Sequence, residues 1–184
     1  RSVADCVERM EKYRIVGYTD TEPYDSKYIY LGTDEYLEKY RSDGIENVVI
    51  CIGYMGKGNL RETLYEKLKR MGFLFPIIAD PSAIISKSAT LEEGVFIGKS
   101  AIINAGAKVE KMCIVNTKAL VEHDCYIESY SHVAVGAVLC GGVHIGRSSF
   151  IGANATVIQG MELPDRSFIP AGLTIRKDTK NNGI

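Results

Sequence analysis

The second half of the chain repeats an aliphatic residue at every sixth position, without one insertion. An α-helix repeats its buried positions every 3.6 residues and a strand every two, so neither gives a period of six. A hexapeptide period predicts a parallel β-helix, in which each unit supplies one short strand and one corner. The positions of the series are Ile85, Leu91, Ile97, Ile103, Val109, Val115, Val121, Ile127, Val133, Leu139, Ile145, Ile151, Val157, Leu163, Ile169 and Ile175.

A second position of the repeat, four residues after each aliphatic one, is mostly small, as at Ala101, Ala119 and Ala137. We expect the aliphatic residue to point inward and the small residue to fit a tight corner. Three units would close one triangular coil, so residues about 18 apart should lie above one another. Glycine or asparagine often follows the aliphatic residue and indicates a turn.

The first part of the chain alternates short helical and strand-like patterns instead. This order predicts a small, Rossmann-like α/β domain over residues 1–80, followed by the β-helix over residues 81–184. Such sheets bind ligands beyond the carboxyl ends of their strands, here near Asp20 and Gly53. The expected elements are a helix over 2–13 capped by Ser2, strands over 14–20 and 47–53, a helix end over 37–44, and a helix over 59–72 that buries Leu60, Leu64 and Leu68.

The chain opens directly on a helix, so we expect it to begin downstream of the first strand and glycine-rich turn of such a domain. The glycine-rich stretch "GYMGKGN" at residues 53–59 follows a predicted strand. It lacks the spacing of a P-loop, which favours a flexible loop over a phosphate cradle.

Composition and charge exclude several classes of function. The net charge is −1, from 22 basic and 23 acidic residues with no long basic run, so no nucleic-acid surface is indicated. No apolar run is long enough for a membrane span, and no signal-peptide pattern is present. The five scattered cysteines include no CxxC pair, which favours reduced thiols in a cytoplasmic protein.

The stretch "VEHDCYIESYSH" holds the candidate chemistry, because it contains two of the three histidines. His123 should lie at an outward corner between Glu122 and Asp124. A neutral imidazole can take a proton from an attacking amine or hydroxyl, and a carboxylate on its other nitrogen fixes the tautomer. Gly141 lies 18 residues on, so its N–H should stack over His123 and could meet an oxyanion. The alternatives are a solvated surface histidine and a glycine that serves only a tight corner.

Three segments carry a family resemblance: "NTKALVEHDCYI", "SHVAVGAVLCGGVHIG" and "FIGANATV". With the α/β front half, they resemble the sialic acid O-acetyltransferases and UDP-4-amino-sugar N-acetyltransferases. The resemblance implies a left-handed β-helix, acetyl-CoA as co-substrate and a homotrimer. It also implies His123 as general base, Asp124 as the acid that raises its basicity, and His132 and Gly141 beside the acetyl group. The acid is often Glu in that family and is Asp here.

His132 lies nine residues from His123, half a coil away, so the two should share a site only where neighbouring chains meet. Asn116 is either a turn residue or part of the substrate site. Small residues at Ala153, Asn154, Ala171 and Gly172 would let pantetheine run along the coils. Arg176 and Lys177 either bind a CoA phosphate or form a solvated tail.

The sequence therefore predicts acetyl transfer from acetyl-CoA to an amino or hydroxyl group of a sugar, expected to be a UDP-linked 4-amino sugar. A zinc-dependent, carbonic-anhydrase-like enzyme is an alternative, but three histidines on different faces argue against a metal site, and no metal is expected. A scaffold without catalysis is the non-enzymatic alternative. The sequence leaves open which sugar is used and whether nitrogen or oxygen is acetylated.

Overall fold

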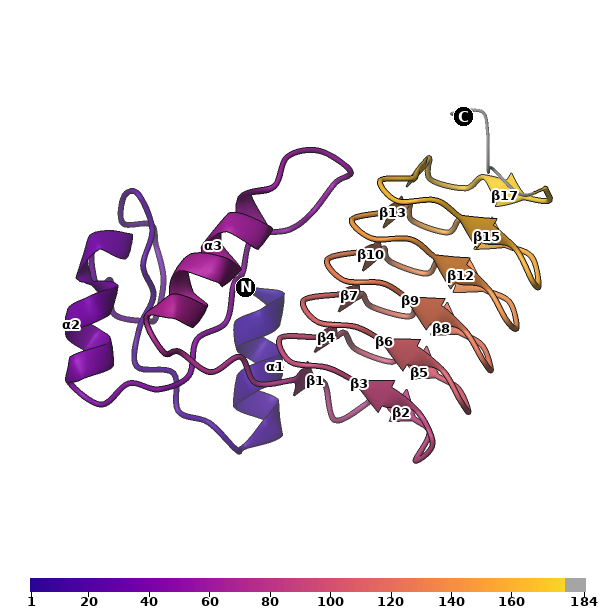
Figure 1. The fold of residues 1–184 in the computed structure, drawn as a ribbon. Coiled ribbons are helices and arrows are strands. Elements are labelled where there is room, and N and C mark those ends of the chain that lie inside the picture. Colours follow the sequence, from indigo (N-terminus) through magenta and orange to yellow (C-terminus); the bar gives the residue numbers. More distant parts are fainter. Residues whose placement is uncertain (178–184) are drawn as a thin grey trace.

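The computed structural model describes residues 1–177 and shows two parts of different construction. The first part is helical, and the second is a parallel β-helix that begins at β1 and runs through β17 (Figure 1). Within the second part, each six-residue unit contributes a two-residue strand. The strands are β1 Ile78–Ala79, β2 Ile84–Ile85, β3 Thr90–Leu91, β4 Phe96–Ile97, β5 Ile102–Ile103, β6 Lys108–Val109, β7 Ile114–Val115, β8 Leu120–Val121, β9 Tyr126–Ile127, β10 His132–Val133, β11 Val138–Leu139, β12 His144–Ile145, β13 Phe150–Ile151, β14 Thr156–Val157, β15 Glu162–Leu163, β16 Phe168–Ile169 and β17 Thr174–Ile175.

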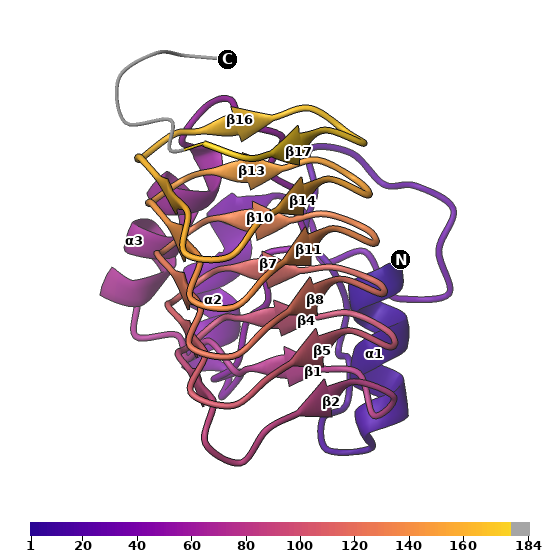
Figure 2. The ribbon, with the colours of Figure 1, turned by 90° about the vertical axis from the view of Figure 1, so that its right-hand side faces the viewer.

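The strands form three parallel sheets, which make the three faces of a prism (Figure 2). Sheet 1 has the order β1-β4-β7-β10-β13-β16, sheet 2 the order β17-β14-β11-β8-β5-β2, and sheet 3 the order β15-β12-β9-β6-β3. Partners are 18 residues apart, as where His132 pairs with Ile114 on one side and Phe150 on the other. The predicted coil length is therefore confirmed.

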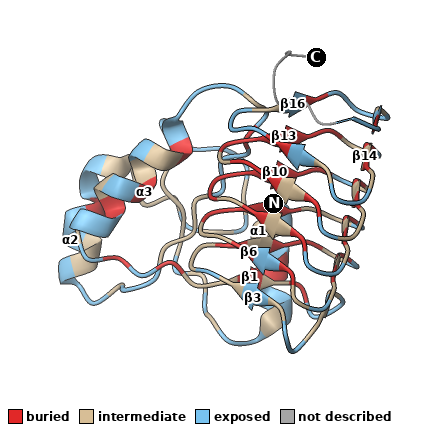
Figure 3. Cartoon of the chain, turned by 45° about the vertical axis from the view of Figure 1, so that its right-hand side comes forward, coloured by how far each residue is buried: buried red, intermediate tan, exposed pale blue. Residues whose placement is uncertain are grey.

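The aliphatic series fills the interior of the prism, as the repeat predicts (Figure 3). Val121, Ile127 and Val133 are fully buried, and so are the small corner residues Ala119 and Ala137. Each inward side chain contacts its equivalents in the coils above and below, so the core is one continuous column rather than a sphere.

We expect Ile127→Ala to lower the free energy of unfolding by about 2–5 kcal/mol, because it leaves a cavity in a stack that cannot collapse around it. Urea denaturation would measure the change. Ile84→Ala is the matched control, since Ile84 is 64% exposed on the outer face, and it should cost far less. Equal losses for the two variants would contradict an interior built from the aliphatic series.

From Leu91 to Ile169, the corners turn at the third residue after each inward aliphatic one, where the backbone is left-handed. Asp124, Asn154 and Gly142 occupy this position with φ of 58°, 55° and 67°. The glycine that directly follows an aliphatic residue serves a different purpose. At Gly152, which has no positive φ, a Cβ would lie 2.5 Å from the backbone nitrogen of Ala171 in the next coil. Close approach of neighbouring coils therefore explains that glycine, rather than the predicted turn conformation.

The front part contains three α-helices, α1 (Ser2–Met10), α2 (Leu37–Ser42) and α3 (Leu60–Arg70), with a short 3-10 turn over Asp34–Tyr36. The predicted cap by Ser2 is wrong: Arg1 occupies the N-cap position of α1 and no side chain caps the helix. Leu60 is also 55% exposed, since the buried face of α3 consists of Arg61, Tyr65 and Leu68.

The two strands predicted in the front part are absent between residues 1 and 77, where only isolated parallel bridges occur, Tyr18 with Tyr30 and Asn47 with Leu74. A strand forms only where a neighbour runs beside it over several residues, and each of these segments meets a partner at one point. The structure therefore shows a short helical region before the β-helix. No helix within residues 1–177 is long and apolar enough to cross a membrane.

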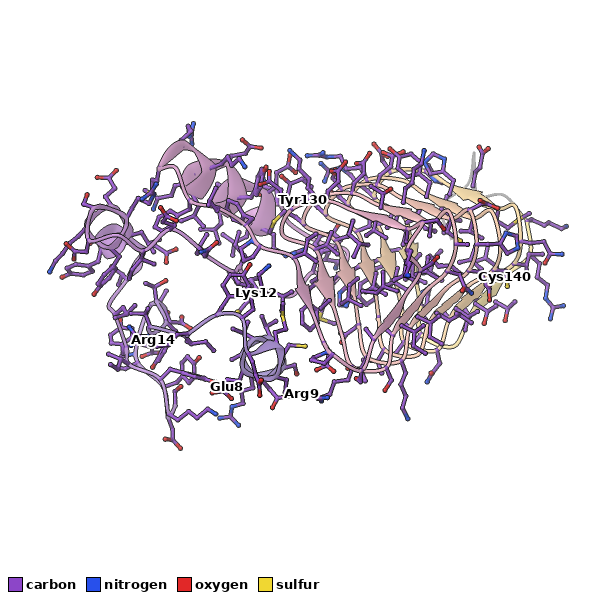
Figure 4. The ribbon with its side chains drawn as sticks, turned by 90° about the horizontal axis from the view of Figure 1, so that it is seen from below. Glu8, Arg9, Lys12, Arg14, Tyr130 and Cys140 are labelled. Atoms are coloured by element: carbon purple, nitrogen blue, oxygen red, sulfur yellow. The ribbon has the colours of Figure 1, made fainter. Side chains whose placement is uncertain are left out.

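The front part covers sheet 1 and leaves sheets 2 and 3 open. Cys6 and Val7 of α1 pack on Ile78 at the first coil. Higher up, Tyr65 and Leu68 of α3 join Tyr130 in a second apolar cluster. Viewed along the prism, Tyr130 lies beside the helices, whereas Cys140 lies at the corner farthest from them (Figure 4).

Candidate active site

His123 and Asp124 lie together at the corner between β8 and β9. The Nδ1 atom of His123 is 3.0 Å from Oδ2 of Asp124, and both side chains are exposed, at 64% and 74%. Because an ionised carboxylate only accepts hydrogen bonds, Nδ1 carries the proton and the lone pair of Nε2 is free. The hydrogen bond to Asp124 raises the pKa of His123 above its ordinary value. Glu122 instead accepts the backbone N–H of His123 at 3.1 Å, so Asp124 is the carboxylate that orients the ring.

Gly141 lies directly against the imidazole of His123, as its 18-residue spacing predicts. A Cβ at Gly141 would be 2.5 Å from Nε2 of His123, so only glycine leaves room for the ring in this position. The chain is held in register here because the Gly142 N–H donates to the His123 carbonyl at 2.9 Å. Within residues 1–177, the N–H of Gly141 itself has no acceptor. The corner therefore presents a free lone pair and a free N–H side by side.

Gly106 makes the equivalent space for Asp124 one coil earlier. A Cβ there would be 2.4 Å from Oδ1 of Asp124. The same carboxylate borders an open groove of about 520 Å³ along the outer face of sheet 3, whose walls include Lys108, Glu110 and Tyr126. A ligand in this groove would lie beside the carboxylate that orients His123.

His132 and Asn116 lie together on sheet 1, away from His123. Nε2 of His132 is 3.3 Å from Nδ2 of Asn116, and Nδ1 is 2.6 Å from the backbone oxygen of Tyr54. His132 is only 9% exposed, and burial lowers its pKa. In one chain, His132 is therefore separated from the His123 corner and covered by the front part.

The other predicted donor residues follow two edges of the prism. Ala153 and Asn154 turn the corner after β13, and Ala171 and Gly172 stack one coil above them, with the Gly172 N–H bonded to the Ala153 carbonyl at 2.8 Å. Lys177 is exposed and follows β17, on the edge that carries His123 and Gly141.

The two residues predicted from the front part lie in separate loops. Asp20 is exposed, and its backbone oxygen accepts a hydrogen bond from Tyr30 at 3.2 Å. Gly53 is exposed and directly precedes Tyr54. Because neither residue ends a strand, the reason given for them from the sequence does not hold.

His144 lies on sheet 3, on a face of its own. Its Nε2 is 2.7 Å from Oε1 of Glu128, and its ring stacks on Tyr126 at 5.0 Å. In the described part of the chain, no three His, Cys, Asp or Glu side chains are grouped so that they could hold a metal ion.

Comparison with known proteins agrees with this architecture. A family model for the hexapeptide repeat of succinyl-transferase matches residues 89–117 and 142–177. The chain carries this repeat over the matched segments. It is similar to PerB from Caulobacter crescentus, solved with CoA and GDP-perosamine, at 29% identity and a TM-score of 0.91, covering 96% of this chain and 84% of that one.

The chain is also similar to the acetyltransferase domain of PglB from Neisseria gonorrhoeae in complex with acetyl coenzyme A. The identity is 27% and the TM-score 0.88, over 96% of this chain and 85% of that one. Both relatives span the front part as well as the β-helix. The predicted resemblance to hexapeptide-repeat sugar acetyltransferases is therefore confirmed.

Sequence reasoning missed two residues at these sites. Gly106 could have been found, because it lies 18 residues before Asp124 in the same column. Tyr54 could not, because it meets His132 across 78 residues through a loop that carries no repeat.

Proposed function

We propose that the protein transfers the acetyl group of acetyl-CoA to the amino group of a nucleotide-linked sugar. The observation that carries the proposal is the corner of His123, Asp124 and Gly141, where a free imidazole nitrogen adjoins a free backbone N–H. The similarity to PerB, solved with CoA and GDP-perosamine, supports the choice of substrates.

In this mechanism the sugar amine attacks the thioester carbonyl while Nε2 of His123 takes its proton. Asp124 holds the ring by Nδ1–H and stabilises the imidazolium that forms. The Gly141 N–H faces the oxyanion of the tetrahedral intermediate. The C–S bond then breaks, CoA leaves as thiolate, and the imidazolium returns the proton to sulfur.

A steady-state assay with acetyl-CoA tests the proposal against UDP- and GDP-linked 4-amino sugars, with the matching 4-hydroxy sugars as the comparison. Release of free CoA that requires the 4-amino group is the expected result. Turnover of the hydroxy sugars would assign O-acetylation instead. The absence of turnover with every sugar would favour the non-catalytic scaffold, and turnover lost on chelation and restored by zinc would favour the carbonic-anhydrase-like alternative.

We propose that donor binding uses Ala153, Asn154, Ala171, Gly172 and Lys177. The small residues at the corners after β13 and β16 leave an unobstructed path for the pantetheine arm, and Lys177 would reach a phosphate of CoA. We assign Asp20, Gly53 and Asn116 to the sugar nucleotide. The two halves, residues 1–80 and 81–184, would then bind the two substrates between them. We take the left-handed winding from the family resemblance, the Rossmann-like character of the front half from its alternating sequence pattern, and a cytoplasmic location from the five free cysteines.

We propose a homotrimer, because one chain does not assemble the site. The His123 corner adjoins Cys140, which lies at the corner farthest from the front part (Figure 4). Sheet 2 also carries an outward column of aliphatic residues, Ile84, Ile102, Leu120 and Val138, of which Ile84 is 64% exposed. A second copy that covers this column would bring its own front part toward His123.

Light scattering at micromolar concentration should therefore report three times the mass of the chain. Leu120→Lys places a charge in the middle of the aliphatic column and should reduce the mass to that of one chain, with loss of activity. Lys108→Glu, on the open face of sheet 3, is the control for mass alone, since Lys108 lines the groove beside Asp124. A monomeric parent with full activity would contradict a site shared between chains.

The pH dependence tests the pairing of His123 with Asp124. The base must be neutral, so kcat should rise with pH through the pKa of His123, which Asp124 holds above its ordinary value. Asp124→Asn removes that charge, so the rising limb should move to lower pH, toward about 6.5. The limiting rate should fall less than in His123→Asn. A limb that stays in place would mean that another group orients the base.

A further inference from the structure

The glycine-rich loop over residues 53–59 is fixed on sheet 1 by a tyrosine. The hydroxyl of Tyr54 donates to the backbone oxygen of Ser148 at 2.6 Å, and Tyr54 is only 7% exposed. Two residues on, a Cβ at Gly56 would lie 2.4 Å from the ring of Phe168, so the loop backbone lies directly on the β-helix. This loop leads into α3 and reaches toward the coil of β13 (Figure 1).

The hydrogen bonds of His132 leave one arrangement of protons for a neutral ring. Nδ1 is 2.6 Å from the Tyr54 carbonyl, which can only accept, so Nδ1 carries the hydrogen. Nε2 is then an acceptor. The neighbouring amide is consistent with this, because Oδ1 of Asn116 accepts the N–H of Thr117 at 2.8 Å, which turns the Asn116 NH2 group toward Nε2.

The surroundings of His132 disfavour a charged ring. Burial lowers its pKa, and the edge of Phe150 packs against it at 5.3 Å between ring centres. From α3, the guanidinium of Arg61 adds to this effect, and Arg61 is only 5% exposed. Among residues 1–177, its Nε and Nη1 atoms have no hydrogen-bond partner. A second cation beside it would be strongly unfavourable.

We propose that Tyr54 is a positioning residue that locks His132 as a hydrogen-bond acceptor. Its backbone carbonyl fixes the Nδ1–H tautomer, and its hydroxyl fixes the loop that supplies the carbonyl. His132 then has no hydrogen to offer the acetyl oxygen. It receives an N–H group at Nε2, from Asn116 in this structure and from an amide of the pantetheine arm in the loaded site.

The pantetheine step rests on the proposed function, whereas the tautomer does not. The 3.3 Å contact with Asn116 is long for a hydrogen bond, so a ligand amide can replace it at little cost. The oxyanion is left to the Gly141 N–H, and a change at Tyr54 should weaken donor binding rather than the chemical step.

Nitrogen-15 NMR of ring-labelled histidine tests the tautomer in the unliganded full chain. The three histidines give few signals, and His132 is identified by the signal lost in His132→Asn. We expect Nδ1 to be protonated and Nε2 bare, with no titration near pH 6.5, where a free imidazole gains its charge. An Nε2–H tautomer, or ordinary titration of His132, would overturn the proposal.

Variants of Tyr54 test its part in the lock. Tyr54→Ala should free the loop, so that His132 loses the fixed acceptor at Nδ1 and shows mixed tautomers. Tyr54→Phe keeps the carbonyl and should keep more of the Nδ1–H tautomer. Tyr24→Ala is the control, since Tyr24 is 48% exposed in another loop. An unchanged His132 signal in a folded Tyr54→Ala protein would refute the role of Tyr54.

Kinetics then separate this proposal from the proposed function. Loss of one buried hydrogen bond in Tyr54→Phe should raise KM for acetyl-CoA about 2–10-fold, with kcat and its pH limb unchanged. If NMR shows the expected tautomer but the protein has no acetyltransferase activity, only the proposed function is contradicted. Normal turnover with the wrong tautomer, or a fall in kcat alone in Tyr54→Phe, would contradict only the role given to Tyr54.

Discussion

Replacing His123 with Asn should lower kcat by about 10²–10⁴-fold, the usual contribution of a positioned general base. Asn occupies similar space but cannot take a proton at neutral pH. The KM for acetyl-CoA should change little, because Nε2 acts on the acceptor amine. The rising limb of the pH–rate profile should disappear, since the titrating group is gone. Steady-state kinetics over a range of pH would measure all three effects.

The fold should survive this change, which keeps the test interpretable. The His123 side chain is 64% exposed at a corner and takes no part in the aliphatic core. His144→Asn is the matched control: it removes an imidazole that is also paired with a carboxylate, Glu128, but lies on another face. A His123→Asn protein that assembles normally and turns over at the parental rate would mean that another group is the base.

The β-helix was predictable because each six-residue period of the sequence forms one strand and one corner of the structure. The aliphatic residue of each unit points inward, and a slip of one position would place a polar residue in the column, so the pattern fixes the register over many coils. The same arithmetic predicted that Gly141 stacks on His123, since columns repeat every 18 residues. Parallel pairing of His132 with Ile114 and Phe150 confirms that spacing.

The front part was less predictable because its elements depend on distant partners. Residues 14–20 and 47–53 have apolar patterns that suit a strand, yet each forms only one bridge. Strand formation depends on a neighbour that a local pattern does not report. Likewise, the burial of His132 depends on Tyr54, which approaches from the front part. The sequence indicated a functional histidine there, but not which of its nitrogens carries the proton.

Gly141→Ala should lower kcat by roughly 10²-fold while leaving the stability of the protein almost unchanged. Gly141 has no positive φ, so its backbone accepts alanine, unlike Gly142 at 67°. The new Cβ would lie 2.5 Å from Nε2 of His123, and the exposed ring can swing away at little cost. Misplacing a reacting group by about 1 Å is enough to cost about 10²-fold in rate.

Gln159→Ala, one coil further along the same column, is the control and should retain full activity. Thermal denaturation of Gly141→Ala should give nearly the parental midpoint, which separates a displaced ring from a damaged fold. Because the ring leaves Asp124, the pH limb of Gly141→Ala should also move down, toward about pH 6.5. A large loss of stability would instead assign Gly141 to the corner alone.

The double variant His123→Asn with Gly141→Ala decides how Gly141 acts. Alanine keeps the N–H of residue 141. If Gly141→Ala lowers the rate only by displacing the His123 ring, it can have no further effect in a protein that lacks the ring. The double variant should then be no slower than His123→Asn alone, since residues that act as one unit are not additive. A further 10²-fold loss in the double variant would show that the Cβ also blocks the acetyl oxygen from the Gly141 N–H. In that case the space kept free at Gly141 serves the oxyanion as well as the base.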